Sequence, residues 1–232
     1  MYFKYGEKEI SYLKNKDKKL AEVIEKVGFI ERETEPELFS ALVHHIVGQQ
    51  ISTKAQATIW ERMKNSLGAV TPETILNASE NEIRSFGISL RKVEYIRDFA
   101  RKVHMGEFDI DAAEKMDDDE LIKYLTSLKG VGVWTAEMIL LFSLERPNVL
   151  SFNDLGIQRG LRMVYHHRKI DRKLFEKYRK RYSPYCSVTS PYLPRLGLVS
   201  IANSAPFLST FLASVVLAYF WIFATLWSFV ET

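Results

Sequence analysis

The sequence predicts an all-α protein: a two-lobed bundle of short helices organised around one tight helical hairpin. Apolar residues recur at the three- and four-residue spacing of an amphipathic helix through most of the first 182 residues. These runs are separated by brief links in which Ser, Thr or Asp precedes a helix and Gly follows it. The alternation of apolar and polar residues that indicates a half-buried strand is missing from the sequence.

The composition is that of an ordinary globular protein. The chain has 232 residues, of which 47% are apolar and 26% charged, enough for one sizeable core or two small lobes. Its net charge of +3 is too small to identify a polyanionic partner. The single cysteine, Cys186, excludes an intrachain disulfide and a cysteine-ligated iron–sulfur cluster. Because the N-terminus also lacks a signal-peptide core, we expect a cytoplasmic protein.

The residues that typically start and end helices give the expected bounds of the helices before the hairpin. The first run, 8–27, has helical apolar spacing and ends at Gly28, and the next, 38–47, follows an acidic turn at 34–37. Chain order suggests that the middle helices pack as one lobe and that the first and last helices form a second. Further helices are expected over 53–67 after a Ser52 cap, after Thr71, after Ser79, from the 86–92 turn to Val103, and over 109–115.

The hairpin, 125–144, joins a helix over 119–127 to an almost entirely apolar helix over 133–144 through the glycine-rich turn 130–132. Glycine adopts positive φ readily and lets another backbone approach closely. Such a turn leaves main-chain N–H groups pointing outward at a helix N-terminus, where a phosphate can bind. We therefore predict an anion site at this turn.

The loop 148–156 follows the hairpin and carries Asp154 where the next helical run, 154–166, begins; the last clear helix is 172–182. An Asp in this position commonly does no more than cap the helix. It is also a lone carboxylate placed after a phosphate site, an arrangement suited to catalysis on a nucleic acid. The two roles are compatible, and both stay open.

Four stretches of the chain stand out together: Ile46–Ser52, Gly87–Lys92, Leu128–Ala136 and Asp154–Gly160. In this order they resemble the helix-hairpin-helix (HhH-GPD) DNA glycosylases, and most closely the alkylation-repair branch, 3-methyladenine DNA glycosylase II. The resemblance implies the HhH-GPD glycosylase fold and a base-excision-repair enzyme that hydrolyses the N-glycosidic bond of alkylated purines, such as 3-methyladenine, in duplex DNA by base flipping. The alternative is a helix-hairpin-helix DNA-binding protein without catalysis.

One hairpin position bears on the type of enzyme. In the bifunctional members of the family, the residue two after the second glycine is a lysine that attacks the sugar to form a Schiff base. Trp134 stands at that position here. The resemblance therefore implies a monofunctional enzyme without lyase activity.

The resemblance also assigns roles to single residues. Asp154 would be the catalytic carboxylate, and Gln50 the wedge that fills the gap left by the flipped base. Trp134 and Met138 would line the base pocket, with ordinary core packing as the alternative for both. The other expected DNA contacts are Gln49, which has the alternative of bonding its own loop, and Ser52, Lys92, Lys129, Gly130, Val131, Gly132, Thr135 and Arg159.

No cofactor is expected, apart from a monovalent cation at the hairpin carbonyls of Lys129 and Val131 that the resemblance implies. Two pairs of adjacent histidines do not predict a metal site, because neighbouring residues on a helix diverge by about 100° and no cysteine or HExxH pattern accompanies them. The expected partner is double-stranded DNA with damaged bases, bound by a monomer at the nucleoid.

The likeness covers roughly residues 34–190, which places the boundary of a glycosylase domain, 1–190, at its end. The closing helix of the family is matched at 183–190 but would run further. Pro191 and Pro194 fall inside that continuation, and each costs about 3 kcal/mol in a helix interior.

The tail, 191–232, is atypical because it carries no charged residue between 196 and 230. Its apolar run, 207–230, is long enough to cross a bilayer. Three interpretations stay open: the tail re-enters the core as a substitute helix, anchors the protein in a membrane, or comes from an altered reading frame. We favour a divergent or altered end, which predicts an incomplete pocket wall and allows for an inactive chain.

Overall fold

The computed structural model describes residues 1–196, and the backbone of this part is built from the helices α1 to α13 and a further helical segment at 192–196. Within these residues the one strand-like pairing is an isolated antiparallel bridge between Tyr2 and Glu33. The predicted all-α class is therefore confirmed. Within the same part of the chain, no helix combines the length and the apolar character needed to cross a bilayer.

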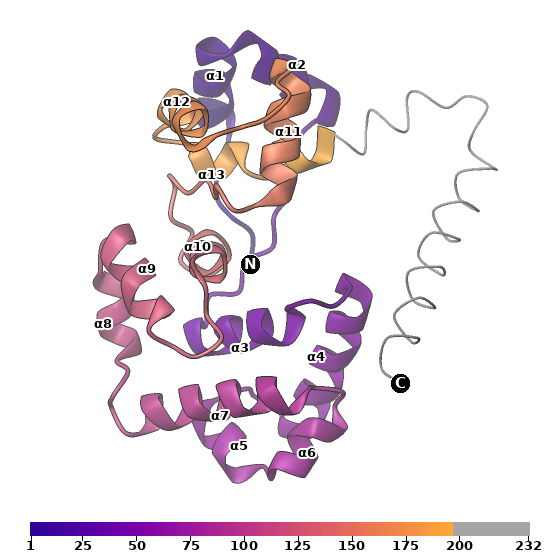
Figure 1. Cartoon of the computed structure of the whole chain (residues 1–232), viewed down its shortest axis with the longest axis vertical. Helices are drawn as coiled ribbons and strands as arrows, with labels where there is room; N and C mark the ends of the chain where they lie inside the picture. Colours follow the sequence, from indigo (N-terminus) through magenta and orange to yellow (C-terminus); the bar gives the residue numbers. More distant parts are fainter. Residues whose placement is uncertain (197–232) are drawn as a thin grey trace, which may run out of the picture.

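Two groups of helices form separate hydrophobic cores, as chain order predicted (Figure 1). The middle lobe is built around buried residues between Leu38 and Val149. Its helices are α3 (Leu38–Gly48), α4 (Thr53–Leu67), α5 (Pro72–Asn77), α6 (Glu80–Ser85), α7 (Leu90–His104), α8 (Ile110–Lys115), α9 (Asp118–Thr126) and α10 (Val133–Phe142). The long helix α7 packs against α3 and α5, and α10 packs on α3 and α9.

The terminal lobe combines the two ends of the described chain, so its core joins residues from 3–30 to residues from 150–193. Aromatic side chains dominate it: Phe175, Tyr182 and Tyr192 are almost fully buried. This lobe lies above the middle lobe in Figure 1, and the chain crosses between the two near 31–37 and 143–150. Its helices are α1 (Glu7–Lys16), α2 (Lys18–Val27), α11 (Leu155–Tyr165), α12 (Arg172–Tyr182) and α13 (Cys186–Thr189).

Side-chain caps start most of these helices where the sequence predicted them. An oxygen of each capping side chain accepts a backbone N–H from the first turn, which satisfies a group that the helix leaves unpaired. The predicted helix starts at Ser52, Thr71, Ser79 and Asp154 are observed as caps. Asp109, which was expected inside a helix over 109–115, is the cap of α8 instead.

The prediction of one continuous helix over 8–27 is wrong. Asp17 breaks it, because its backbone is extended and its buried carboxylate caps α2 by accepting the N–H of Leu20. The same carboxylate accepts hydrogen bonds from Tyr165 at 2.7 Å and Arg181 at 2.5 Å. Apolar periodicity continues across the break and therefore hides it.

The first residues of the predicted tail belong to the terminal lobe. Residues 192–196 are helical, and Tyr192 and Leu193 are completely buried. The backbone of Leu193 lies so close to α11 that a Cβ added to Gly160 would come within 2.3 Å of its carbonyl oxygen. A boundary at 190 is therefore too early for the packed part of the chain. The predicted apolar span, 207–230, lies outside the described residues.

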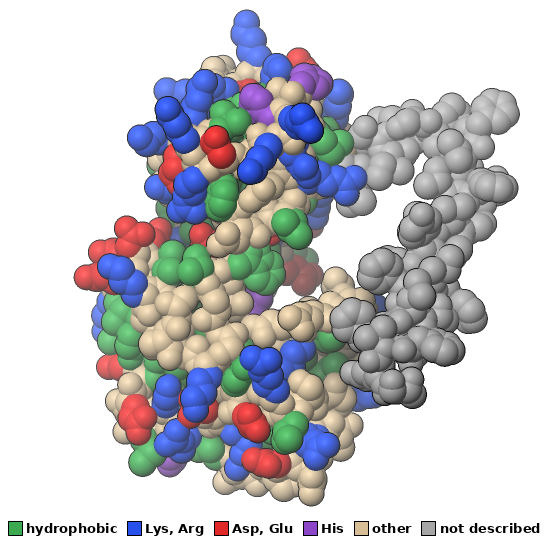
Figure 2. Space-filling view, viewed as in Figure 1, with side chains coloured by type: hydrophobic (Ala, Val, Ile, Leu, Met, Phe, Trp, Pro, Cys, Tyr) green, Lys and Arg blue, Asp and Glu red, His purple; other side chains and the backbone are tan. Residues whose placement is uncertain are grey.

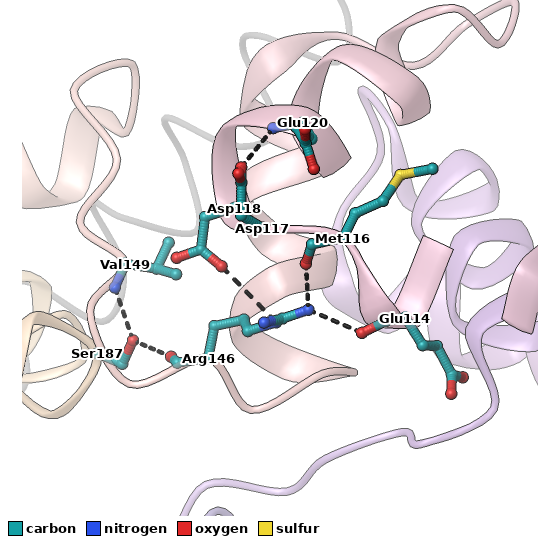
Figure 3. Close-up of polar contacts among 8 residues, drawn as sticks. All are labelled: Glu114, Met116, Asp117, Asp118, Glu120, Arg146, Val149 and Ser187. Atoms are coloured by element: carbon teal, nitrogen blue, oxygen red, sulfur yellow. Dashed lines mark hydrogen bonds and ion pairs between the residues drawn. The ribbon is translucent and has the colours of Figure 1, made fainter. Parts of the chain in front are cut away.

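A cluster of polar contacts joins the lobes at the second crossing (Figure 3). Arg146 pairs with Asp118 at 3.6 Å and donates to the carbonyls of Glu114 and Met116, which holds the crossing against the α8–α9 junction. From the terminal lobe, the buried hydroxyl of Ser187 donates to the carbonyl of Arg146 and accepts the N–H of Val149. The loop that carries Asp154 begins directly after this cluster.

Candidate functional site

The hairpin turn is shaped by Gly130, whose φ of 80° lies in the left-handed region. A Cβ at this position would also come within 2.2 Å of the ring of Tyr95. Gly132 differs, because its φ is −94° and nothing lies within 4 Å of the place where its Cβ would stand. The prediction of positive φ therefore holds for Gly130 alone, while Gly132 leaves open space beside the turn.

Several main-chain donors face outward at this turn. The N–H groups of Gly130, Gly132 and Trp134 have no acceptor within the described part of the chain. Because α10 begins at Val133, these donors lie at a positive helix end. Such donors are available to an anion, and the anion site stays a prediction.

The loop after α3 is bound to the hairpin by Gln49, whose side chain donates to the carbonyl of Gly130 at 2.8 Å. Lys92, from α7, donates to the carbonyls of Val47 and Gln49 at 2.8 and 2.6 Å. Lys92 therefore ties the loop to α7, and its predicted contact with DNA stays a prediction. Gln49 takes the role of bonding within the protein that the sequence had left as an alternative.

Gln50 and Ser52 are exposed at the tip of this loop. Gln50 has a φ of 59°, in a region that side chains other than Gly seldom adopt. The bonds of its neighbour Gln49 to the hairpin and to Lys92 hold the loop in this conformation. Ser52 caps α4 by accepting the N–H of Ala55 at 3.2 Å. A backbone held in this sparsely populated region, with an exposed side chain, is a feature typical of functional sites.

Asp154 lies against the hairpin. Its Oδ2 accepts the indole N–H of Trp134 at 3.1 Å, and its Oδ1 accepts the N–H of Ile157 at 2.9 Å as the cap of α11. A carboxylate has about four lone-pair sites, so these two bonds leave further acceptor capacity on the half-buried group. The structure thus brings the predicted anion site and the predicted carboxylate together, with 40% of the Trp134 side chain exposed.

Sequence reasoning missed a second carboxylate, Glu137, one turn after Trp134 on α10. It accepts a hydrogen bond from the buried hydroxyl of Ser151, three residues before Asp154. Burial raises the pKa of Glu137 above its usual 4.5, Ser151 and Arg172 oppose the rise, and the charge of Asp154 adds to it. Residues 134 and 137 are three apart, so their side chains lie on the same face of one helix. This spacing could have indicated that both bond to the same loop.

A cavity of about 270 Å³ lies between the lobes behind this loop. Val133 and Glu137 of α10, Phe152 of the loop and Arg172 of α12 are among its lining residues. The guanidinium of Arg172 lies 5.0 Å from the centre of the Phe152 ring. Trp134 and Asp154 are not among the lining residues, so the cavity is separate from the surface on which those two side chains meet.

Three predicted contacts lie inside the protein. The side chain of Thr135 is 5% exposed, and Met138 packs in the core of the middle lobe. Val131 is buried as well, and its N–H bonds to the carbonyl of Leu128. The prediction that Thr135 contacts DNA is therefore corrected for its side chain, and Met138 takes the core-packing role that the sequence had left as its alternative. Which face of α10 points into the core depends on tertiary packing.

Two predicted cations are exposed. Lys129 stands at the hairpin, 3.8 Å from Asp98, and Arg159 stands on α11. The carbonyls of Lys129 and Val131 accept no hydrogen bond from the described part of the chain, so they are available to a cation, which stays a prediction. His44 pairs with Glu35 at 2.9 Å, and burial lowers the pKa of its neighbour His45 to about 4.

Residues 43–184 match the family described as HhH-GPD superfamily base excision DNA repair proteins. The chain is 33% identical over 162 residues to DNA-3-methyladenine glycosylase 1 of Schizosaccharomyces pombe, covering 68% of this chain and 71% of the relative. Among solved structures, a Bacillus halodurans DNA-3-methyladenine glycosidase is similar with a TM-score of 0.73 and 36% identity, covering 84% and 91% of the two chains. A Schizosaccharomyces pombe 3-methyladenine DNA glycosylase in complex with abasic DNA has a TM-score of 0.71 and 30% identity, with coverage of 81% and 95%.

Proposed function

Because the chain belongs to the HhH-GPD superfamily of base excision DNA repair proteins, we propose that it is a monofunctional glycosylase that releases alkylated purines from duplex DNA. The relatives named 3-methyladenine DNA glycosylases support this class of substrate. The observation that carries the proposal is the hydrogen bond between Trp134 and Asp154. It fixes a carboxylate beside an aromatic face and a row of main-chain donors, all of which the reaction needs.

Binding would begin at the hairpin. The N–H groups at Gly130, Gly132 and Trp134 would hold a phosphate next to the damaged nucleotide, and Lys129 would add positive charge. The carbonyls of Lys129 and Val131 would hold a monovalent cation, which would supply further positive charge for the phosphate. Base excision requires the nucleotide to leave the stack, at a cost of a few kcal/mol that is smallest for a damaged base. Gln50, exposed beside the hairpin, would fill the space that the base vacates.

Asp154 would act on the sugar. Breaking the N-glycosidic bond develops positive charge on the sugar, which a fixed carboxylate stabilises. Because Trp134 and Ile157 occupy only part of its acceptor capacity, Asp154 can also accept a proton from an attacking water. The exposed ring of Trp134 can stack on a base that carries positive charge.

The same residue argues against a lyase step. A lyase needs an amine that attacks the sugar and forms a Schiff base. Trp134 offers an indole N–H at that position, and this N–H is already bonded to Asp154. We therefore propose that hydrolysis by water is the single chemical step and that borohydride traps no covalent complex with DNA.

The test is the release of 3-methyladenine from methylated duplex DNA by the wild type and by Asp154→Asn. An Asn can still cap α11, so the variant should fold, and we expect its rate to fall by about two orders of magnitude or more. Asp171→Asn is the matched control, because Asp171 caps α12 with the same geometry and lies outside the site. Unchanged release by Asp154→Asn rejects the role of Asp154. No release by the wild type favours a DNA-binding protein without catalysis.

A further inference from the structure

Helix α12 carries the strongest concentration of positive charge in the terminal lobe. Its eleven residues include six Lys or Arg side chains and one acidic side chain, Glu176. The inner side of the helix is fixed by three buried aromatic side chains, Phe175, Tyr178 and Tyr182. Lys and Arg side chains accordingly gather on the surface of this lobe in Figure 2.

The arginines of α12 have carboxylate partners. Arg172 and Arg179 lie 3.5 and 2.9 Å from Glu176, and Arg181 bonds to the buried Asp17. The lysines do not: within residues 1–196, no carboxylate lies within 4 Å of the ammonium group of any of the three lysines of α12. These exposed side chains, Lys173, Lys177 and Lys180, are called the α12 lysine stripe.

The stripe follows one side of the helix. Its members are separated by four and three residues, so they are neighbours on the helix surface and border the same shallow hollow. Like charges at this spacing destabilise a helix, and cations in its first turn oppose the helix dipole. Asp171 and Glu176 line the same hollow and offset part of this repulsion, and a bound polyanion would relieve the rest.

The shape and surroundings of the stripe indicate the kind of polyanion. The seven-residue separation from Lys173 to Lys180 spans ~10 Å of helix, about the length of three nucleotides of one DNA strand. A helix that lies on a membrane exposes large apolar side chains beside its cations. None of the large exposed hydrophobic side chains of residues 1–196 lies on α12. The chemistry is therefore that of a nucleic-acid backbone and not that of a lipid surface.

We propose that the α12 lysine stripe is a second DNA-binding surface, which holds the phosphates of duplex DNA outside the segment bound at the hairpin. The stripe contacts backbone charge and reads no bases, so its contribution is independent of sequence and of damage. The inference rests on the DNA binding in the proposed function. It does not depend on catalysis by Asp154.

The test compares the wild type with the triple variant Lys173→Gln/Lys177→Gln/Lys180→Gln. Equilibrium binding to undamaged duplexes of about 10 and about 40 base pairs is measured over a range of salt concentrations. Loss of three phosphate contacts should reduce the slope of log affinity against log salt by roughly 2.7 for the long duplex. We expect little change for the short duplex, and a melting temperature equal to or above that of the wild type.

A matched control neutralises three other exposed lysines, Lys8, Lys26 and Lys115, and should leave most of the slope intact. Equal losses in the control and in the stripe variant would show an effect of net charge and overturn the proposal. An unchanged slope in the stripe variant overturns it too, as does a loss of binding to phosphatidylserine vesicles with DNA binding unchanged. If the wild type binds DNA with the expected stripe dependence but releases no base, the stripe stands and the catalytic proposal falls.

Discussion

Asp154 and Glu137 are two carboxylates close to one another in separate environments. Asp154 is exposed enough to meet a substrate and bonds to Trp134, while Glu137 lies behind the loop and bonds to Ser151. Each hydrogen bond joins one turn of α10, which carries Trp134 and Glu137, to the loop that carries Ser151 and Asp154. Two side chains of α10 are thus bonded to the same loop, Trp134 at Asp154 and Glu137 at Ser151.

Glu137→Gln tests this arrangement through pH. A carboxyl whose pKa is raised by folding stabilises the protein below its unfolded value, near 4.5, and that stability is lost as pH rises through the folded pKa. Glutamine does not ionise and can still bond to Ser151. We therefore expect the variant to gain stability relative to the wild type as pH rises above about 4.5. Urea unfolding from pH 4 to 8 measures it, and a difference that does not change with pH contradicts the assigned pKa direction.

Single residues were predictable where local chemistry decides their position. Asp154 and Ser52 were read correctly as caps, because a cap is set by its own first turn. The positions of Thr135 and Lys92 were not predictable from local chemistry. The burial of Thr135 depends on which face of α10 the core covers. The position of the Lys92 side chain depends on its bonds to carbonyls 45 and 43 residues away in the sequence. Contacts of that range leave no local signal in a single sequence.

The hairpin shows how two glycines of one element differ. Gly130→Ala should destabilise the protein by about 1–3 kcal/mol, because it combines a φ of 80° with a Cβ that meets Tyr95. Gly132→Ala should change the free energy of unfolding by less than ~0.5 kcal/mol, since its φ is ordinary and its surroundings are open. Its methyl group would instead occupy the space that a phosphate approaches. DNA binding that is unaffected by Gly132→Ala would place the phosphate elsewhere.

The presence of the helices was predicted well, but their ends and the breaks between them were predicted less well. The existence of the helices followed from apolar spacing, and α10 ends at Phe142, two residues before the expected end. The break at Asp17 was missed because Leu13 and Leu20, on either side of it, keep the same helical spacing and are both buried. What stabilises the break is a partner from the other end of the lobe, Arg181.

At the scale of the whole molecule, the two lobes are connected where the chain crosses twice between their hydrophobic cores. Arg32, on the first crossing, lies 3.7 Å from the centre of the Phe3 ring and donates to the carbonyl of Ser187. Burial lowers the pKa of this guanidinium to about 10. The division into two lobes was predictable from chain order, but the residues that join them were not, because each bond spans more than thirty residues of sequence.

Ser187→Ala tests the contact between the lobes just before the loop that carries Asp154. The hydroxyl is fully buried, accepts the N–H of Val149 and donates to the carbonyl of Arg146, so its removal leaves both backbone groups without this partner. We expect a loss of about 1–3 kcal/mol in the free energy of unfolding, measured by urea denaturation. Because Val149 begins the segment that positions Asp154, 3-methyladenine release should also slow at temperatures where the variant is fully folded. Ser66→Ala is the control: its exposed hydroxyl bonds to Glu82 at 3.2 Å, and we expect less than ~0.5 kcal/mol. Equal stability of the two variants would mean that the Ser187 hydroxyl does not stabilise the contact between the lobes.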